Sequence, residues 1–207
     1  MARAKTSRSW MQQHVADPYV RRAQARGYRS RAAFKLLEID AKDRLFAPGQ
    51  AVVDLGAAPG SWSQVAAEKA TPRGLVVAVD VLAMAPLAGV TFVHGDFGEA
   101  AVLREVEQAL AGRGVDLVLS DMSPNLSGVA AADQARSTHL CELAVDFALT
   151  HLAPGGSLLV KAFQGTGFPP LLARIRSGFE HVVSRKPGAS RSRSREMYIL
   201  ARGRRIR

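Results

Sequence analysis

The amino-acid sequence predicts an α/β fold, with a mostly parallel, doubly wound sheet and an antiparallel strand near the C-terminus. Short stretches rich in valine and leucine alternate with longer amphipathic stretches, which is typical of parallel strands covered by helices on both faces. A glycine-rich turn follows the first of these apolar stretches. The last two extended stretches are joined only by an arginine-rich loop, too short for a helical crossover, so they should pair antiparallel.

Each element can be placed along the chain. An amphipathic helix carrying Lys35 follows Ser30, because apolar residues recur with helical spacing as far as Ile39, and it ends before Pro48. Parallel strands are expected at Ala51–Leu55, Leu75–Val79, Val90–Val93, Val115–Leu119 and Ser157–Val160. Further helices are expected at Ser61–Lys69, Glu99–Ala111, Ala132–Leu152 and Pro170–Ser177. The antiparallel pair is expected at Glu180–Ser184 and Met197–Ala201.

The composition indicates a single domain over residues 1–207. Hydrophobic residues make up 47% of the chain and charged residues 22%, as in ordinary globular domains. The single cysteine, Cys141, cannot form an internal disulfide, and the five histidines show no ligand spacing, so we expect no metal site and read the histidines as structural or surface residues. No apolar run is long enough to span a membrane. We therefore expect a cytoplasmic monomer that does not associate with membranes.

The positive charge gathers in two terminal segments. Residues 1–35 and residues 185–207 each hold nine basic residues and one acidic residue, whereas residues 36–184 have a net charge of −6. A basic tail can simply be a solvated surface. Here apolar and aromatic residues interleave with the charges, so both segments are expected to be ordered and to contact the phosphates of a nucleic acid. These interleaved residues are Trp10, Tyr19, Tyr28, Phe34, Met197, Tyr198 and Ile199.

The glycine-rich turn marks the expected ligand site. Gly56 and Gly60 follow the strand at 51–55, and in doubly wound sheets ligands bind beyond the carboxyl ends of the strands. The spacing G-x-x-x-G differs from the G-x-G-x-x-G fingerprint of dinucleotide-binding folds. This difference argues against an NAD-dependent oxidoreductase.

Three acids stand at successive strand ends and should converge on that turn. Asp80 is placed to accept the hydroxyls of an adenosine ribose, Asp96 to accept the exocyclic amine of adenine, and Asp121 follows the fourth strand. Each acid alone could be a helix or loop cap. Together they favour a nucleoside pocket without a pyrophosphate anchor, and hence an adenosyl cofactor.

Four motifs resemble those of the FtsJ/RlmE family of ribosomal RNA ribose methyltransferases, over about residues 28–202. The resemblance implies a Rossmann-like methyltransferase fold, S-adenosylmethionine as cofactor, and 2′-O-methylation of a uridine in the aminoacyl-site loop of 23S ribosomal RNA, in the large ribosomal subunit. The sequence departs from the family at Ser61, where a second glycine is usual. The motifs are DLGAAPG at 54–60, SDMSPN at 120–125, VKAFQG at 160–165 and SRSREMY at 192–198.

The family's residues map onto this sequence one by one. The catalytic set falls on Lys35, Asp121, Lys161 and Glu196, and the cofactor contacts fall on Gly60, Trp62, Asp80, Asp96 and Asp121. A ribose hydroxyl is a poor nucleophile, so it needs a positioned base or stabilisation of the developing alkoxide. Lys161 is the residue expected to act on it, either as base or as electrostatic stabiliser. Asp121 is expected to orient Lys161, and Glu196 to hold Lys35 or the substrate hydroxyl.

The same residues bear on other methyl-transfer chemistries and on a non-catalytic function. Methylation of a base amine is disfavoured because Asn125, and no aromatic residue, follows Pro124. Carbon-5 methylation is disfavoured because Cys141 lies in a helical stretch, where it reads as a small core residue. Two alternatives stay open: 2′-O-methylation of another RNA such as transfer RNA, and a non-catalytic ribosomal RNA-binding assembly factor. The complete set of two lysines and two acids favours an enzyme over that factor.

Overall fold

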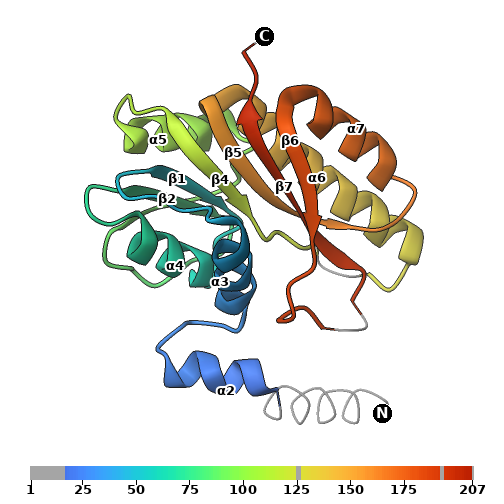
Figure 1. Ribbon diagram of the computed structural model, residues 1–207, viewed down its shortest axis with the longest axis horizontal. Coiled ribbons are helices and arrows are strands. Elements are labelled where there is room, and N and C mark those ends of the chain that lie inside the picture. The colour runs from blue at the N-terminus through green and yellow to red at the C-terminus, as the bar shows by residue number, and fades with distance from the viewer. Residues whose placement is uncertain (1–16, 125–126, 192–193, 207) are drawn as a thin grey trace.

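A seven-stranded sheet forms the centre of the molecule (Figure 1). The computed structural model describes residues 17–124, 127–191 and 194–206. The strand order is β3-β2-β1-β4-β5-β7-β6, and β7 is antiparallel to both of its neighbours, whereas the remaining paired strands run parallel. The predicted fold class is confirmed. The strands are β1 (Ala51–Leu55), β2 (Leu75–Asp80), β3 (Val90–His94), β4 (Val115–Ser120), β5 (Leu152–Phe163), β6 (Phe179–Arg185) and β7 (Glu196–Arg204).

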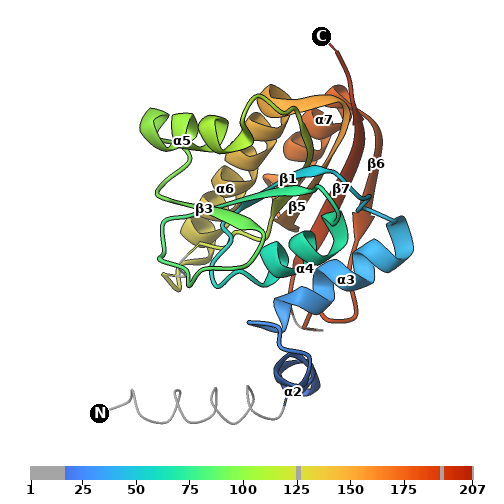
Figure 2. The same cartoon turned by 90° about the vertical axis from the view of Figure 1, so that its left-hand side faces the viewer.

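Helices cover both faces of the sheet, as the views in Figures 1 and 2 show. Two helices pack on one face and three on the other, while α2 lies apart from the sheet and packs against α3. None of the described helices is long and apolar enough to cross a lipid bilayer. The helices are α2 (Pro18–Ala25), α3 (Ala32–Asp43) and α4 (Ser61–Ala70) before the fourth strand, with α5 (Ala100–Leu110), α6 (Ala130–His151) and α7 (Phe168–Gly178) completing the set.

Alternating side chains along the strands build two separate cores. In β1, Val52 points to the core beneath α3 and α4, whereas Val53 points to the core beneath α5, α6 and α7. Successive residues of a strand face opposite sides of a sheet, so a strand buried on both faces must be apolar at every position. All five residues of β1 are buried, and one of them is a carboxylic acid, Asp54.

The element bounds agree with the prediction to within about two residues, except around β5 and at the end of β7, which continues to Arg204 where Ala201 was predicted. Strand β5 begins at Leu152, which was expected to end the preceding helix, and it continues to Phe163, past the predicted end at Val160. Its start is irregular: Val115 of β4 pairs with Leu152 but Leu117 pairs with Ser157, so residues 153–156 form a bulge. The Pro154-Gly155-Gly156 run reads as a turn in sequence, because a bulge and a turn use the same residue types.

Helix α2 is an element that the sequence analysis did not place. Asp17 caps it by accepting a hydrogen bond from the backbone N–H of Tyr19 at 2.9 Å, and Pro18 occupies the first helical position, which is a standard start signal. The helix packs through Ala23 against Phe34 of α3. Trp10, which also belongs to the predicted basic segment, lies outside the described residues.

Asp54 sits in the sheet core directly before the glycine turn. It is 1% exposed and accepts a hydrogen bond from the Ser63 hydroxyl at 2.6 Å. Burial raises the pKa of its carboxyl to about 7; the Ser63 hydrogen bond opposes this, and the nearby charges of Asp121 and Asp80 add to it. The folded protein therefore binds a proton on Asp54 that the unfolded chain releases once the pH exceeds about 4.

We predict that Asp54 makes stability depend on pH. Between about pH 4 and pH 7 the folded state holds more protons than the unfolded chain, so the contribution of Asp54 to stability falls as pH rises. Asp54→Asn has no proton to lose and keeps an acceptor for Ser63. Its free energy of unfolding, relative to wild type, should rise with pH across this window by at most about 4 kcal/mol, as measured by urea titration. A difference that does not change between pH 4 and pH 8 contradicts the prediction.

Candidate active site

The four predicted catalytic residues meet at the carboxyl end of the sheet. Lys161 Nζ lies 3.0 Å from Asp121 Oδ1 and donates to the backbone carbonyl of Asp121 at 2.5 Å. Lys35 Nζ lies 3.0 Å from Glu196 Oε1 and 4.0 Å from Asp121 Oδ1. The side chains therefore form a continuous chain of alternating charge, Lys161 to Asp121 to Lys35 to Glu196. Of the two partners that the sequence left open for Glu196, Lys35 is the one it contacts.

The sheet register brings these residues together. Asp121 directly follows β4, Lys161 lies in β5, and Glu196 opens β7, where it pairs with Phe163. Lys35 reaches the site from α3, which packs across the same end of the sheet. Lys161 is 6% exposed, and the other three side chains are 12 to 18% exposed. Two buried cations are stable here because two carboxylates balance their charge.

Tyr198 is a member of this site that the sequence analysis assigned elsewhere. It was grouped with the apolar and aromatic residues that interleave with the charges of the C-terminal segment. In the structure it is fully buried, and Ile199 beside it belongs to the core as well. The Tyr198 hydroxyl donates to Asp121 Oδ1 at 2.7 Å. Burial, together with the charges of Asp121 and Glu196, holds the pKa of Tyr198 well above 10. The hydroxyl thus remains a donor, and it orients the same oxygen that binds Lys161.

A first cavity of about 550 Å³ lies over the carboxyl ends of β1, β2, β3 and β4. All three strand-end acids, Asp80, Asp96 and Asp121, line it, together with Gly56 of the glycine turn. Its volume is within the range of small-molecule sites. The convergence expected from the sequence is therefore present: acids and apolar walls enclose one space beside Asp121. The apolar lining comes from residues such as Val79, Leu82, Phe97, Met122, Leu140 and Leu143.

The glycine turn is shaped by its conformation and by Asp80. Gly56 has φ +73°, and a Cβ there would come within 2.2 Å of the Met122 side chain. A larger residue at 56 would therefore push Met122 into the cavity. Asp80 accepts hydrogen bonds from the backbone N–H groups of Ala58 and Leu82, both at 2.8 Å. One carboxylate thus joins the turn after β1 to the turn after β2.

Gly60 and Trp62 lie outside this cavity. Trp62 is 3% exposed, its indole N–H donates to the Ala32 carbonyl at 2.9 Å, and its ring packs against Tyr198 with centroids 5.6 Å apart. Gly60 has φ +102° and closes the turn. His139, which the sequence analysis read as structural or surface, does line the cavity. A polar residue of α6 facing the strand ends carries no local sequence signal that would have marked it.

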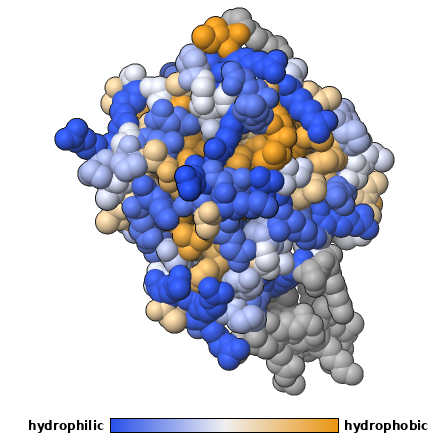
Figure 3. Space-filling view, in the orientation of Figure 1, coloured by the Kyte–Doolittle hydropathy of each residue, from blue (hydrophilic) through white to orange (hydrophobic). Residues whose placement is uncertain are grey.

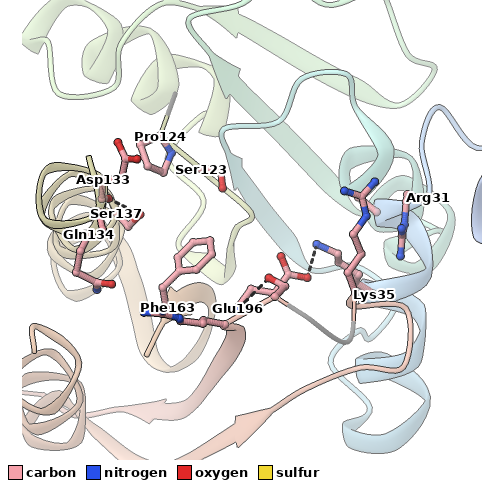
Figure 4. A pocket seen from close by; sticks show the side chains of 14 residues that line it. Arg31, Lys35, Ser123, Pro124, Asp133, Gln134, Ser137, Phe163 and Glu196 are labelled. Carbon is pink, nitrogen blue, oxygen red and sulfur yellow. Dashed lines mark hydrogen bonds and ion pairs between the residues drawn. The ribbon is translucent and has the colours of Figure 1, made fainter. Parts of the chain in front are cut away.

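A second cavity, of about 820 Å³, lies on the other side of the charged cluster (Figure 4). Lys35 and Glu196 line it, and Phe163, Pro124 and Ser137 face it from the strand end and α6. Three arginines stand on its wall, namely Arg31, Arg191 and Arg195. Ser123 lines both cavities. The two cavities therefore adjoin at Ser123, close in sequence to Asp121, which lines the first cavity and binds Lys161.

Cys141 supports this arrangement from α6. It is buried, and its thiol donates to the backbone carbonyl of Lys161 at 2.6 Å. Burial raises the pKa of the thiol to about 12, an effect that the nearby charge of Lys161 opposes. A thiol that stays protonated is a poor nucleophile, so Cys141 acts as the core residue predicted from the sequence.

The comparisons with known proteins agree with this geometry. A protein named ribosomal RNA large subunit methyltransferase E from Chromobacterium violaceum is 59% identical over 205 residues, covering 99% of this chain and all of that one. A protein of the same name from Azoarcus is 60% identical over 200 residues, covering 97% of this chain and 98% of that one.

A solved structure is similar as well. The crystal structure of a ribosomal RNA methyltransferase from Plasmodium falciparum superimposes with a TM-score of 0.78 at 28% identity, covering 87% of this chain and all of that one. The family model described as FtsJ-like methyltransferase matches residues 28–204, nearly the range over which the motifs resemble that family. The match includes all four residues of the charged cluster and the acids of the first cavity. The chain belongs to the FtsJ-like methyltransferase family.

Proposed function

We propose that this protein transfers a methyl group from S-adenosylmethionine to a ribose 2′-hydroxyl of ribosomal RNA in the large subunit. The observation that carries the proposal is that the two cavities share Ser123 and lie on either side of the charged cluster, in which Asp121 binds Lys161. One cavity suits an adenosyl group and the other an anionic polymer. The names of the relatives support ribosomal RNA of the large subunit as the substrate.

The first cavity fits S-adenosylmethionine in its size and its donor set. Asp80 and Asp96 place carboxylates where hydroxyls and an amine can donate to them, and the rest of the lining is largely apolar. No arginine or lysine lines this cavity, so within the described part of the chain no guanidinium or ammonium there would hold a pyrophosphate. When bound, the cofactor supplies a methyl group on a positively charged sulfur. Asp121 and Ser123 stand at the side from which the hydroxyl would approach.

Lys161 is the group we place on the substrate oxygen. Its ammonium has three N–H donors, and within the described residues two of them are taken by the backbone and side-chain oxygens of Asp121. The third is left for the 2′-oxygen. Because both contacts of its ammonium within the described residues are with acceptor oxygens of Asp121, which favour a charged ammonium, we assign it the role of electrostatic stabiliser of the developing alkoxide. The carboxylates of Asp121 and Glu196 offer acceptors for the hydroxyl proton.

The two terminal segments support RNA binding. Arg22 lies over the rings of Tyr19 and Phe34, with its Cζ atom 5.3 and 4.7 Å from the ring centroids, and Arg26 lies 5.9 Å from that of Phe34. Stacking on aromatic rings holds a guanidinium in place while its N–H groups stay available to phosphates. Figure 3 shows a mostly hydrophilic surface at the end of the molecule where α2 lies. The aromatic residues of the N-terminal segment thus support its arginines, as expected.

The first prediction from this proposal concerns the cofactor. Asp80→Asn replaces a carboxylate that can take hydrogen bonds from a ribose diol, and charged hydrogen bonds contribute roughly 1.5 to 3 kcal/mol each. The affinity for S-adenosylmethionine should fall by roughly 10- to 100-fold in calorimetry. Asp54→Asn, a control at a buried acid that does not line the cavity, should change it far less. NAD should not bind. Equal affinities in the two variants would contradict the assignment.

The second prediction concerns catalysis. Lys161→Ala removes a group needed mainly in the transition state, so it should slow methyl transfer without weakening ground-state binding. The single-turnover rate on large ribosomal subunits should fall by about 10² to 10⁴, while cofactor affinity stays within about twofold. Lys69→Ala is the control. Lys69 lies outside the site, where its Nζ atom is 3.1 Å from Asp40 Oδ2, so this variant should keep the wild-type rate. A Lys161→Ala rate above about a tenth of wild type would remove Lys161 from the mechanism.

The third prediction concerns RNA binding. Charge reversal at Arg22, Arg26 and Arg191 should weaken binding to ribosomal RNA and flatten the log-log dependence of affinity on salt by about 0.7 to 0.9 for each lost phosphate contact. Reversal at Arg104 and Arg176, on the helices of the opposite face, should leave the slope unchanged. If both sets of variants give the wild-type slope, the terminal segments are only a solvated surface.

A further inference from the structure

The connector between α2 and α3, residues 26–31, is bonded to the glycine turn and to α4. The backbone N–H of Arg29 donates to Gln64 Oε1 at 2.9 Å, and Gln64 Nε2 donates back to the Gly27 carbonyl at 2.9 Å. The hydroxyls of Ser30 and Ser61 lie 2.6 Å apart. These contacts attach a segment of the RNA-binding region to the helix that begins at the cofactor turn.

Arg29 makes the strongest of these attachments. Its guanidinium donates to the backbone carbonyls of Pro59 at 2.9 Å, Ala85 at 2.8 Å and Pro86 at 2.7 Å. Pro59 belongs to the glycine turn, while residues 85–86 follow the stretch containing Val81 and Leu82, which lines the cofactor cavity. A guanidinium has five donors in a rigid plane. Arg29 therefore fixes two backbone segments that border the same cavity.

The glycine at position 60 makes room for this contact. A Cβ on Gly60 would lie 2.9 Å from Arg29 Nη1 and 2.6 Å from the Met84 sulfur. Its φ of +102° also disfavours any side chain. The approach of Arg29 and of the 84–87 segment thus gives a packing reason for glycine at position 60.

The same connector also reaches the RNA-binding segments. Arg31 forms an ion pair with Asp17, the cap of α2, and donates to the Ala189 carbonyl in the C-terminal segment. Glu38 accepts a hydrogen bond from the Ala189 N–H at 3.1 Å and one from the Tyr19 hydroxyl at 3.1 Å. The connector therefore contacts the glycine turn on one side and, through Arg31, the cap of α2 and the C-terminal segment on the other, while Glu38 of α3 adds contacts to Tyr19 and Ala189.

We propose that this connector couples RNA binding to cofactor binding, and that Arg29 is a positioning residue for the cofactor cavity and makes no phosphate contact. The inference rests on the proposed function. RNA that orders α2 and residues 187–191 also orders the connector, and with it the glycine turn. Coupling of this kind is reciprocal, so each ligand raises the affinity for the other by the same factor.

The bond between the hydroxyls of Ser30 and Ser61 joins the connector to the first residue of α4. Ser61 is 2% exposed, so its hydroxyl is shielded from water and contributes to the attachment. Ser61, where the sequence departs from the family it resembles, thereby acquires a role in coupling RNA binding to cofactor binding.

The test uses S-adenosylhomocysteine, which binds without reacting, and large ribosomal subunits that lack the modification. For the wild-type protein, saturating subunits should raise the affinity for S-adenosylhomocysteine at least fivefold. Arg29→Lys keeps the charge but replaces a planar guanidinium, whose two terminal nitrogens reach three carbonyls, by a single nitrogen without that geometry. Affinity measured without RNA should therefore fall about tenfold. Arg113→Lys is the matched control, because Arg113 also donates to backbone carbonyls, of Arg73 and Gly49, but at the opposite end of the strands.

Ser61→Ala provides a second, milder variant. It removes one neutral hydrogen bond, which should lower the coupling factor by about fivefold while the affinity for each ligand alone changes less. Thermal melting of each variant separates loss of folding from loss of coupling, and Ser61→Ala carries the test if Arg29→Lys does not fold.

The outcomes separate this inference from the proposed function. Wild-type affinity that is the same with and without subunits, or an Arg29→Lys variant that loses subunit affinity but keeps S-adenosylhomocysteine affinity, overturns the coupling. In both cases, methylation of the subunits by the wild-type protein would leave the proposed function standing. Failure of the wild-type protein to bind S-adenosylhomocysteine at all would instead overturn the proposed function.

Discussion

The active site depends on one carboxylate, that of Asp121. Its Oδ1 atom accepts from Lys161 in β5 and Tyr198 in β7, and it lies 4.0 Å from Lys35 in α3. Three elements that are far apart in the sequence thus share one acceptor. Removing it would leave two buried lysines and a buried phenol without their common partner, and unpaired buried charges are costly. Asp121 also lines the first cavity, the proposed cofactor site. The same carboxylate therefore positions the two lysines and borders the space proposed for the cofactor.

The distribution of charge matches the roles proposed for the two cavities. The cluster of Lys35, Lys161, Asp121 and Glu196 is neutral as a whole, which allows it to be largely buried. The excess of positive charge in the chain lies in the terminal segments. Four of their basic residues, Arg31, Lys35, Arg191 and Arg195, line the second cavity, whereas the acids Asp80, Asp96 and Asp121 line the first. A polyanion is therefore attracted to the second cavity, which is proposed to bind RNA. The first cavity, proposed for the cofactor, carries the carboxylates that a nucleoside can use.

Much of this could be predicted from the sequence, because strand ends and motifs are local features. The position of Asp80, Asp96 and Asp121 at successive strand ends follows from valine-rich strands alone. Tyr198 could not be assigned in that way, because its contact with Asp121 arises from the antiparallel register of β7 on β5, where it lies opposite Lys161. The burial of Trp62 likewise depends on how α3 crosses α4. The roles of Arg29 and Gly60 are non-local too, since they come from a connector that meets the glycine turn only in the folded chain.

The position of β7 has a consequence for when the protein becomes active during its synthesis. This strand is the last element of the chain, yet it is inserted between β5 and β6 and carries both Glu196 and Tyr198. Chains emerge from the ribosome with the N-terminus first, so a nascent chain can form β1 to β5 and the cofactor cavity before it has any complete catalytic cluster. The proposed catalytic cluster is therefore complete only once β7 has joined the sheet, and products truncated before β7 would lack Glu196 and Tyr198 even where most of their sheet has formed.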